Sequence, residues 1–344
     1  MKEVKLGNLI LGNKKEIFVQ SMLSTRRGDP NAAVIQAKEL QDAGCKIIRL
    51  AIPDINEVNT VKILKENINI PVVADIHFDY KLALACIDAG VDKIRINPGN
   101  IGSDEKIKSV AKACKENAVP IRIGVNGGSL EKNILAKYGA PTADALVESA
   151  LYHVSLLEKF DFDDIVISLK SSNVKVMIDA YRKLSSKCNY PLHLGVTEAG
   201  TKNMGIIKNS IGIGSLLADG IGDTIRVSLT ADPIFEVKAG YDILSALGLS
   251  TGRVQFISCP TCGRCQIDLI PLAEKIESAL SNCNKNIKVA VMGCAVNGPG
   301  EAREADIGIA GGKDEGLIFK KGQIVKKVPY SKLFEEFMKE IDRL

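Results

Sequence analysis

The first two-thirds of the chain repeat one pattern, in which a short apolar run is followed by a longer stretch with helical periodicity. A β-strand is predicted at each of eight such runs: Ile17–Met22, Lys46–Ala51, Pro71–His77, Lys93–Asn97, Pro120–Asn126, Asp164–Lys170, Pro191–Glu198 and Asp223–Leu229. Helices are predicted between them, for example over Ala32–Ala43, Val58–Glu66, Tyr80–Ala89, Ser103–Glu116 and Ala143–Leu157. Eight strands alternating with helices are typical of an α/β fold of the (β/α)8 TIM-barrel type. A doubly wound open sheet is the alternative, but it more usually has five or six strands.

The pattern changes after a last predicted barrel helix over Ile234–Leu247, where the run from Gly248 to Gly252 interrupts it. We therefore divide the chain into two domains, residues 1–250 and residues 251–344. The second domain is predicted to contain strands, a hairpin and two helices: Val254–Ser258, Leu269–Leu280, Asn286–Met292, Ala305–Ala310, Leu317–Val328 and Ser331–Leu344. This content is typical of a small α+β domain that follows the barrel.

Composition excludes several classes of protein. The net charge is only +4, with acidic and basic residues interspersed, and there is no Trp. These features disfavour a nucleic-acid surface, so we expect no nucleic-acid partner. No apolar run reaches membrane-spanning length, and the first residues contain no signal-peptide core. We therefore expect a cytoplasmic protein with no membrane partner.

Polar side chains stand at alternate positions of the predicted strands, mostly towards their C-terminal ends. They are Arg49, Asp75, His77, Arg95, Asn97, Arg122, Asn126, Lys170, Glu198, Arg226 and Ser228. Strands of a parallel barrel are buried on both faces and should be almost wholly apolar. In a TIM barrel the C-terminal ends of the strands form the active site. These positions therefore indicate a polar binding site.

The charges within this set do not balance. Five members are cations, whereas only Asp75 and Glu198 are convincing inward acids. Pairing within the barrel, such as Arg95 with Asp75, would explain any one residue but not the surplus. Since Arg presents donors that suit phosphate oxygens, the set predicts an anionic substrate such as a diphosphate or polyphosphate.

Three titratable residues are candidates for chemistry. Glu198 ends the seventh strand in Thr197-Glu-Ala-Gly200 and is the preferred proton donor or acceptor. His77 and His193 also lie on strands, where a lone histidine is more often a hydrogen-bonded core residue than a catalyst. His77 could instead anchor the loop that follows it.

The second domain contains a Cys-x-x-Cys-x-x-Cys run at Cys259, Cys262 and Cys265, and Cys294 follows about thirty residues later. Thiolates at such spacings bind soft centres, chiefly zinc or iron–sulfur clusters. One close pair with a lone distal cysteine fits a [4Fe-4S] cluster better than a zinc ribbon. Reduced structural cysteines are the plain alternative, but packing alone requires no such spacing. In the Asn297-Gly-Pro-Gly-Glu301 turn beside Cys294, Glu301 can approach the metal and Asn297 the ligand or substrate.

With these residues in place, the chain resembles the 4-hydroxy-3-methylbut-2-enyl diphosphate synthase family of the methylerythritol phosphate route to isoprenoids, in its short bacterial form. The resemblance covers essentially the whole chain. It rests on Val73-Ala-Asp-Ile-His-Phe-Asp79, Arg95-Ile-Asn-Pro-Gly-Asn-Ile-Gly102, Ile121-Arg-Ile-Gly-Val-Asn126, Thr197-Glu-Ala-Gly200, Gly220-Ile-Gly-Asp-Thr224, Cys259-Pro-Thr-Cys262 and Val296-Asn-Gly-Pro-Gly-Glu301.

The resemblance implies a barrel that binds the substrate, followed by a [4Fe-4S] domain. It implies that Cys259, Cys262, Cys294 and Glu301 hold the cluster, and Cys265 is where this chain departs from the family pattern. A carboxylate is a poorer ligand for iron than a thiolate, which would leave that iron more open to substrate. The family also implies ferredoxin or flavodoxin as electron donor, and a head-to-tail homodimer in which each cluster domain closes the partner's barrel. Closure within one chain is the alternative.

The implied reaction is the reductive ring opening and dehydroxylation of 2-C-methyl-D-erythritol 2,4-cyclodiphosphate. We expect the diphosphate to be held by Arg49, Arg95, Arg122, Lys170 and Arg226, and the remaining inward polar residues, with Asn297, to line the substrate site. A non-redox barrel enzyme of the pterin-synthase type with a structural zinc module is the alternative. A zinc-dependent binding module on an inert barrel is a third possibility, which leaves the inward cations unexplained.

Overall fold

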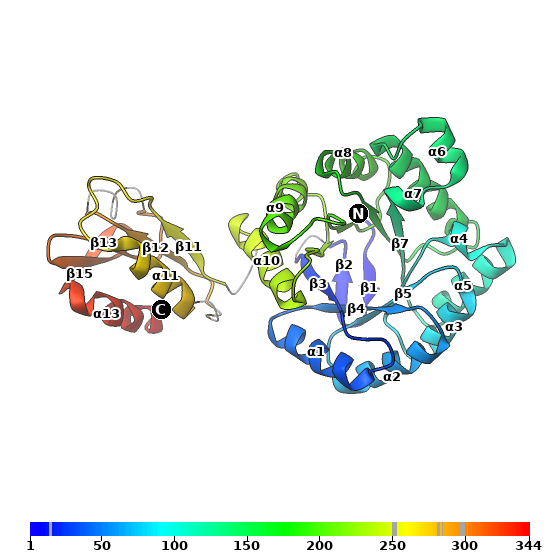
Figure 1. The fold of residues 1–344 in the computed structure, drawn as a ribbon, viewed down its shortest axis with the longest axis horizontal. Helices are drawn as coiled ribbons and strands as arrows, with labels where there is room; N and C mark the ends of the chain where they lie inside the picture. Colours follow the sequence, from blue (N-terminus) through cyan, green and yellow to red (C-terminus); the bar gives the residue numbers. More distant parts are fainter. Residues whose placement is uncertain (14–15, 250–252, 281–282, 284, 296–299, 301) are drawn as a thin grey trace. The chain divides into compact units, whose positions relative to one another are not determined.

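A computed structural model describes residues 1–344 except 14–15, 250–252, 281–282, 284, 296–299 and 301. It divides the chain into two compact units, Met1–Leu247 and Gly248–Leu344. The division that the sequence predicts, between residues 250 and 251, falls outside the described residues. Figure 1 shows both units.

The first unit is a parallel β-barrel, as the sequence predicts. Its strands are β3 (Phe18–Met22), β4 (Ile47–Ile52), β5 (Val72–Ile76), β6 (Lys93–Ile96), β7 (Ile121–Asn126), β8 (Ile165–Lys170), β9 (His193–Leu194) and β10 (Thr224–Ile225). Neighbours pair in the order β8-β7-β6-β5-β4-β3-β10-β9. A parallel bridge between Ile167 and Leu192 joins β8 to β9, which closes the ring.

Helices surround this ring (Figure 1). They are α1 (Pro30–Asp42), α2 (Val58–Asn67), α3 (Tyr80–Asp88), α4 (Pro98–Ile101), α5 (Asp104–Glu116), α6 (Lys132–Tyr138), α7 (Ala143–Glu158), α8 (Val174–Ser185), α9 (Lys202–Ala218) and α10 (Pro233–Ala246). Polar side chains fix several starts: Asp29, Asp79, Thr142, Asn173 and Asp232 each accept a hydrogen bond from the first turn of the helix that follows. These five helices therefore begin where the sequence supplies a cap.

The last two barrel strands are shorter than predicted, because their C-terminal parts leave the ladder. A β-carbon at Gly195 would lie 2.7 Å from the carbonyl oxygen of Arg226, so the backbones approach too closely for a side chain there. Glu198 has a φ of 52° and lies in the left-handed region, which no extended strand adopts. The chain thus turns at this end of the barrel instead of continuing a regular strand.

The sequence reading missed an N-terminal hairpin formed by β1 (Val4–Leu6) and β2 (Leu9–Leu11). Val4, Leu6 and Leu11 are buried in one apolar cluster with barrel residues from four strands, namely Phe18, Ile47, Val73 and Val166. These barrel residues lie at or near the N-terminal ends of their strands. The hairpin therefore covers the end of the barrel opposite the predicted site.

The second unit is built on a mixed sheet in the order β11-β12-β13-β14-β15. Its elements are β11 (Gln255–Ser258), α11 (Leu269–Leu280), β12 (Lys288–Met292), β13 (Ile307–Gly311), β14 (Glu315–Lys320), β15 (Gln323–Pro329) and α13 (Tyr330–Asp342). The predicted hairpin is confirmed, and both turn residues, Lys321 and Gly322, have positive φ as a two-residue turn requires. Apolar residues of both helices share one core with the sheet. Across the described residues of both units, every helix falls short of the length and apolarity that crossing a membrane requires.

We predict that Leu6→Ala destabilises the barrel by about 2–5 kcal/mol, because it deletes a fully buried side chain between the hairpin and the strand ends. Urea unfolding measures the loss. Ile10→Ala in the same hairpin is the matched control, since Ile10 is 45% exposed, and it should cost less than about 1 kcal/mol. Equal losses would contradict the packing role of the hairpin.

Candidate functional site

Inward side chains of the barrel form two polar layers, each supplied by alternate strands as in other TIM barrels. One layer comes from β3, β5, β7 and β9, and the next comes from β4, β6, β8 and β10. The first layer contains Gln20, Arg122 and His193 with the apolar Val73, and the second contains Arg49, Arg95, Ser168 and Arg226. Asp75 lies one step beyond the second layer, at the level of Gly124. The predicted residues Asn97, Asn126, Lys170 and Ser228 lie further towards the C-terminal strand ends. The structure thus brings most of the predicted polar residues into one barrel interior.

Asp75 is the central acid of this interior. Arg49 Nη2 lies 2.5 Å from Asp75 Oδ2, and Arg95 Nη1 lies 3.2 Å from Asp75 Oδ1. Burial alone would raise the pKa of Asp75, but Arg49, a hydrogen bond from His77, and Arg95 together hold that pKa well below its usual range. One carboxylate therefore stabilises two buried guanidinium groups. For Arg95 this is the internal ion pair with Asp75 that the sequence offers as an alternative to ligand binding.

Gly124 makes room for Arg95. A β-carbon at this glycine would lie 2.2 Å from Arg95 Nε, which no packing arrangement allows. Instead Arg95 Nη2 donates to the carbonyl of Gly124 at 2.6 Å, and the amide of Gly124 donates to Asn97 Oδ1 at 2.9 Å. The backbone of β7 therefore fixes the side chains of Arg95 and Asn97 together.

Arg226 pairs with Glu236, an acid that the sequence reading missed. Arg226 Nη2 lies 3.2 Å from Glu236 Oε1, and the amide of Leu229 donates to the same oxygen at 2.9 Å. Burial raises the pKa of Glu236 despite the neighbouring Arg226. Glu236 stands in the first turn of α10, where an acid is ordinary in a helix, so nothing in the sequence marks it as inward.

The structure places Glu198 differently from the inward position that the sequence reading expected. Its side chain is exposed, and it makes no hydrogen bond or ion pair with another described residue. The second acid of the barrel interior is Glu236. The backbone of Glu198 nevertheless remains at the C-terminal end of the seventh barrel strand, beside the turn to Gly200.

Three buried cations have no carboxylate partner among the described residues: Lys93, Arg122 and Lys170. Burial, followed by repulsion from Arg49 and Arg226, holds the pKa of Lys170 well below its usual range. The sequence pattern predicts Lys93 as the first residue of a strand, and its spacing of two from Arg95 places both side chains on the same, inward face. Basic groups therefore outnumber acids in this interior, which favours an anionic ligand.

The remaining predicted residues lie around this set. His77 Nε2 is 3.0 Å from Arg95 Nη1, and its side chain is half exposed beyond the end of β5. Asn126 Oδ1 is buried without a hydrogen-bond partner among the described residues. Ser228 is half-buried, and its carbonyl accepts from Asn209 at 3.3 Å. These three groups line the end of the barrel that carries the cations.

The cysteines of the second unit follow the ends of two neighbouring parallel strands. Cys259 comes directly after β11 and Cys294 comes two residues after β12, so the sheet brings them to the same edge. The amide of Gly293 donates to Cys259 Sγ at 3.2 Å. The backbone amide of Arg264 lowers the pKa of the exposed Cys262 thiol. Amide donors to sulfur and accessible thiolates both suit a thiolate-ligated metal group.

Cys265 differs from these three cysteines. Its thiol donates to the carbonyl of Ile267 at 3.2 Å, and a β-carbon at Gly293 would lie 2.6 Å from Cys265 Sγ. The side chain therefore packs beneath the Gly293 backbone. The predicted ligand Glu301 and the predicted contact residue Asn297 lie outside the described residues. Among the residues that are described, no three possible ligands stand close enough to hold a metal ion.

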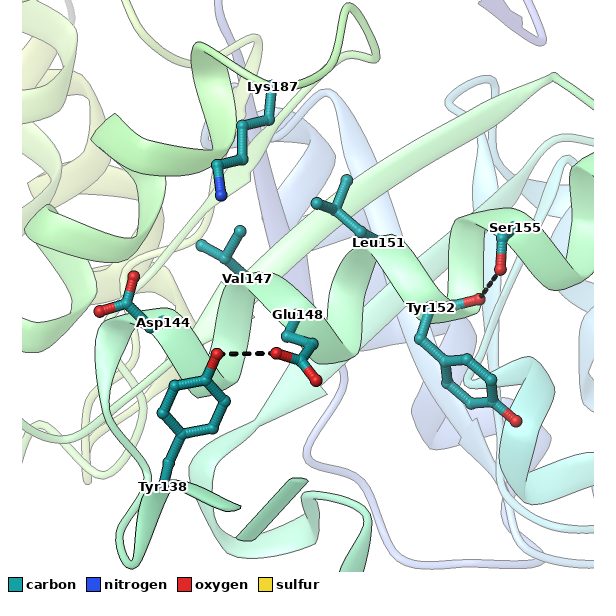
Figure 2. Close-up of a pocket in the computed structure, with 8 residues that line it drawn as sticks. All are labelled: Tyr138, Asp144, Val147, Glu148, Leu151, Tyr152, Ser155 and Lys187. Atoms are coloured by element: carbon teal, nitrogen blue, oxygen red, sulfur yellow. Dashed lines mark hydrogen bonds between the residues drawn. The ribbon is translucent and has the colours of Figure 1, made fainter. Parts of the chain in front are cut away.

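A surface pocket of about 480 Å3 lies elsewhere, along α7 on the outside of the barrel (Figure 2). Its charged groups are satisfied locally: Tyr138 donates to Glu148 at 2.7 Å, and Lys183 lies 2.7 Å from Asp144. Lys187 lines the same pocket. Because none of the predicted site residues reaches it, this pocket is not the candidate site.

Comparison with known proteins gives a match over both units. A family model described as the GcpE TIM-barrel domain matches residues 1–241, and the GcpE protein C-terminal domain matches residues 255–343. Relatives named 4-hydroxy-3-methylbut-2-en-1-yl diphosphate synthase (flavodoxin) are 62% identical in Clostridium perfringens and 59% identical in Clostridium acetobutylicum. Each alignment covers 100% of this chain and 98% of the relative. A third relative of that name, from Fusobacterium nucleatum, is 58% identical over 98% of this chain and 96% of its own length.

Solved structures with a similar fold include the dihydropteroate synthase of Stenotrophomonas maltophilia, with a TM-score of 0.54 and 14% identity. The similarity covers 73% of this chain and 100% of that chain. The enzyme from Vibrio fischeri gives a TM-score of 0.52 at 13% identity. These likenesses show a shared barrel fold only. The relatives do not support the pterin-synthase alternative.

We predict that Asp75→Asn destabilises the barrel by about 3–5 kcal/mol at neutral pH, because it leaves Arg49 and Arg95 buried without their carboxylate. Since the fold lowers the pKa of Asp75, its contribution is complete above the unfolded-state pKa of about 3.9. The contribution is lost as the pH falls through the lower folded-state value. Urea unfolding of both proteins at neutral and acid pH should show a difference that narrows below about pH 4.

Asp144→Asn is the matched control for this prediction. Asp144 forms an ion pair with Lys183, but both side chains are largely exposed, so its loss should be much smaller. A loss in Asp75→Asn no larger than that of the control would mean that the Asp75 pairs do not stabilise the barrel.

Proposed function

The chain belongs to the GcpE family, and on that premise we propose that it catalyses the reaction for which its curated relatives are named. It is an oxidoreductase of the iron–sulfur kind that forms 4-hydroxy-3-methylbut-2-enyl diphosphate in isoprenoid biosynthesis. Its substrate is 2-C-methyl-D-erythritol 2,4-cyclodiphosphate. The reaction breaks the ring C–O bond, consumes two electrons and releases a hydroxyl group as water.

The surplus of buried cations at the C-terminal end of the barrel is the observation that carries this proposal. Asp75 offsets charge on Arg49 and Arg95, and Glu236 offsets charge on Arg226. Cations without a carboxylate remain in the same interior, including Arg122 and Lys170. A cyclic diphosphate carries two negative charges and several acceptor oxygens, which matches this excess of donors.

We assign substrate binding to the inward set from the sequence. The diphosphate is held by Arg49, Arg95, Arg122, Lys170 and Arg226. Around them, Asp75 orients two of the guanidinium groups, and His77, Asn97, Asn126 and Ser228 contact the remaining polar groups of the substrate. Asn297, which lies outside the described residues, completes the set.

Glu198 is the proposed proton donor for the departing hydroxyl group. It stands at the C-terminal end of the seventh barrel strand with no competing partner among the described residues. Its left-handed backbone departs from the strand, which frees the side chain from the barrel wall. An acid of this kind at the open end can approach a substrate that the cations hold by its diphosphate.

We propose a [4Fe-4S] cluster held by Cys259, Cys262, Cys294 and Glu301. The strand ends that place Cys259 and Cys294 at one edge, and the amide that donates to Cys259 Sγ, support this set. When bound, the cluster supplies electrons one at a time. We leave Cys265 out of the proposed set, since its thiol donates to the carbonyl of Ile267.

The relatives are named as flavodoxin-dependent enzymes, so flavodoxin is the proposed electron donor, with ferredoxin as the alternative. A head-to-tail homodimer is the proposed assembly. The basic residues proposed to bind the substrate and the thiols proposed to bind the metal belong to different units of one chain. Pairing two chains gives each barrel a cluster domain. Closure within one chain remains the alternative arrangement.

We predict that the protein purified without oxygen converts the cyclodiphosphate to 4-hydroxy-3-methylbut-2-enyl diphosphate when reduced flavodoxin is supplied. Glu198→Gln should lower kcat about 10²–10⁴-fold while KM changes little, because it removes a proton donor and not a diphosphate contact. Product formation by phosphorus NMR and initial rates measure both effects.

Glu158→Gln, on the outer face of α7, is the matched control and should retain full activity. A wild-type protein that carries iron and sulfide but forms no product would overturn the proposed function. Full activity in Glu198→Gln would overturn only the assignment of the proton donor.

We predict different outcomes for two neighbouring cysteines. Cys262→Ser should lose bound iron and the electron paramagnetic resonance signal of the reduced cluster, because it removes a ligand. Cys265→Ser should keep both, since Cys265 lies beneath Gly293 and donates to Ile267. Iron and sulfide assays of the two variants test this, and iron loss in Cys265→Ser would make Cys265 a ligand.

A further inference from the structure

Four polar residues deep in the barrel surround its axis, and three of them have no role in the proposed substrate site. We call Gln20, Lys93, Arg122 and His193 the inner polar cluster; they come from β3, β6, β7 and β9. Strands β3 and β7 lie on opposite sides of the ring. Arg122 Nη1 nevertheless lies 3.4 Å from Gln20 Oε1, so the guanidinium group crosses the barrel axis.

The cluster is fully enclosed and rich in nitrogen atoms without hydrogen-bond partners. Lys93, Arg122 and His193 are 0% exposed, and Gln20 is 1% exposed. Among the described residues, no partner is present for Gln20 Nε2, Lys93 Nζ, Arg122 Nε, Arg122 Nη2 or His193 Nε2. Buried polar groups in native proteins are nearly always satisfied, because an unmade hydrogen bond is costly. So many unpartnered nitrogens in one place indicate that the cluster serves a ligand.

The imidazole of His193 is fixed by its neighbours, whereas Lys93 obtains no acidic partner. His193 Nδ1 is 2.8 Å from Thr224 Oγ1, which leaves Nε2 on the other side of the ring, and the backbone carbonyl of His193 accepts a hydrogen bond from Tyr181. The acid nearest to Lys93 in sequence, Asp92, is occupied by Lys65 at 2.6 Å and by the amide of Val72 at 2.8 Å. Neither group therefore obtains a carboxylate partner from the described part of the chain.

Charged and titratable groups of several elements act on the cluster: Arg49 on β4, Asp75 on β5, Asp92 before β6, Arg95 on β6, Lys170 on β8 and Tyr181 on α8. Arg226 on β10 and Glu236 on α10 form an ion pair with each other in the same barrel. The acids Asp75 and Asp92 are already paired, with Arg49 and Arg95 and with Lys65. A proton on Lys93 or His193 would therefore add positive charge to a region that is already positive, unless an anion is bound above it.

We propose that Lys93 and His193 form the floor of the anion site, are uncharged in the ligand-free barrel, and take up protons from solvent when the phosphoryl oxyanion binds. This inference rests on the proposed function. It gives Lys93 and His193 a role in selecting phosphoryl anions, because each gains a positive charge when such an anion binds. Burial, followed by repulsion from Arg122, holds the pKa of both groups well below their usual ranges, in agreement with this arrangement. Negative charge from a bound diphosphate reverses that effect.

Proton uptake is measured by titrating the oxygen-free holoenzyme with the cyclodiphosphate, without an electron donor, in buffers of different ionisation enthalpy. Each phosphorus of this ring carries one ester link, one anhydride link and a single acidic oxygen that is already ionised near neutral pH, so protons taken up in that range are bound by the protein. Lys170 is also buried and basic and contributes to the wild-type total. The decisive quantity is therefore the difference between wild type and variants in the number of protons taken up per bound ligand.

Lys93→Met should lower the uptake by up to one proton and weaken binding about tenfold, because a charge close to the anion is lost. It should also flatten the fall in affinity with rising pH. His193→Asn, which can keep the hydrogen bond to Thr224, should act in the same direction and serves as the second variant if Lys93→Met does not fold. Lys112→Met, at an exposed position of α5, is the matched control and should change neither quantity.

An unchanged proton count in both Lys93→Met and His193→Asn would overturn the inference and reduce these residues to a structural role. Binding and turnover of the cyclodiphosphate without proton uptake would also overturn it, but would leave the proposed function intact. Sulfate, which does not titrate near neutral pH, is the second probe. The protein could take up protons with sulfate in a manner that depends on Lys93, and yet not bind the cyclodiphosphate. That result would support the role of Lys93 in the anion site and would overturn the proposed substrate.

Discussion

The cost of burying positive charge is the constraint on which the rest of the barrel depends. Six basic side chains lie in its interior, and only Asp75 and Glu236 form ion pairs with them among the described residues. A cation without a partner in a protein interior costs several kcal/mol, a large part of the stability of one domain. An anion that binds among these basic groups would offset this cost and raise the free energy of unfolding of the barrel.

The arrangement around the cations strengthens this effect. The N-terminal hairpin excludes water from one end of the barrel, so an anion can enter only from the end where the strands terminate. Within this dry interior, electrostatic interactions are stronger than in water. Gly124 and Asn97 fix Arg95 through the backbone, so little side-chain order has to be gained when the substrate binds.

The sequence predicted the features that depend on local pattern and missed those that depend on tertiary contact. Eight strands and their inward polar residues follow from alternation, which a single chain displays. The hairpin at Val4–Leu11 was missed because its strands are three residues long, too short for alternation to be recognised. Glu236 was missed because only the packing of α10 against the barrel directs it inward. The spacing of two between Lys93 and Arg95 indicates an inward side chain, but Lys93 also begins the predicted strand, where the alternation is least clear. Glu198 points outward because its backbone leaves the strand.

The position of the hairpin also bears on synthesis. Its residues are translated before the barrel strands, yet the apolar surface that buries Leu6 includes Val73 and Val166, and the amide of Lys2 donates to the carbonyl of Asn189. More than half of the chain must therefore be translated before the first strands have somewhere to pack. Until then, Leu6 and its neighbours remain exposed on the nascent chain, where they are natural binding sites for a chaperone.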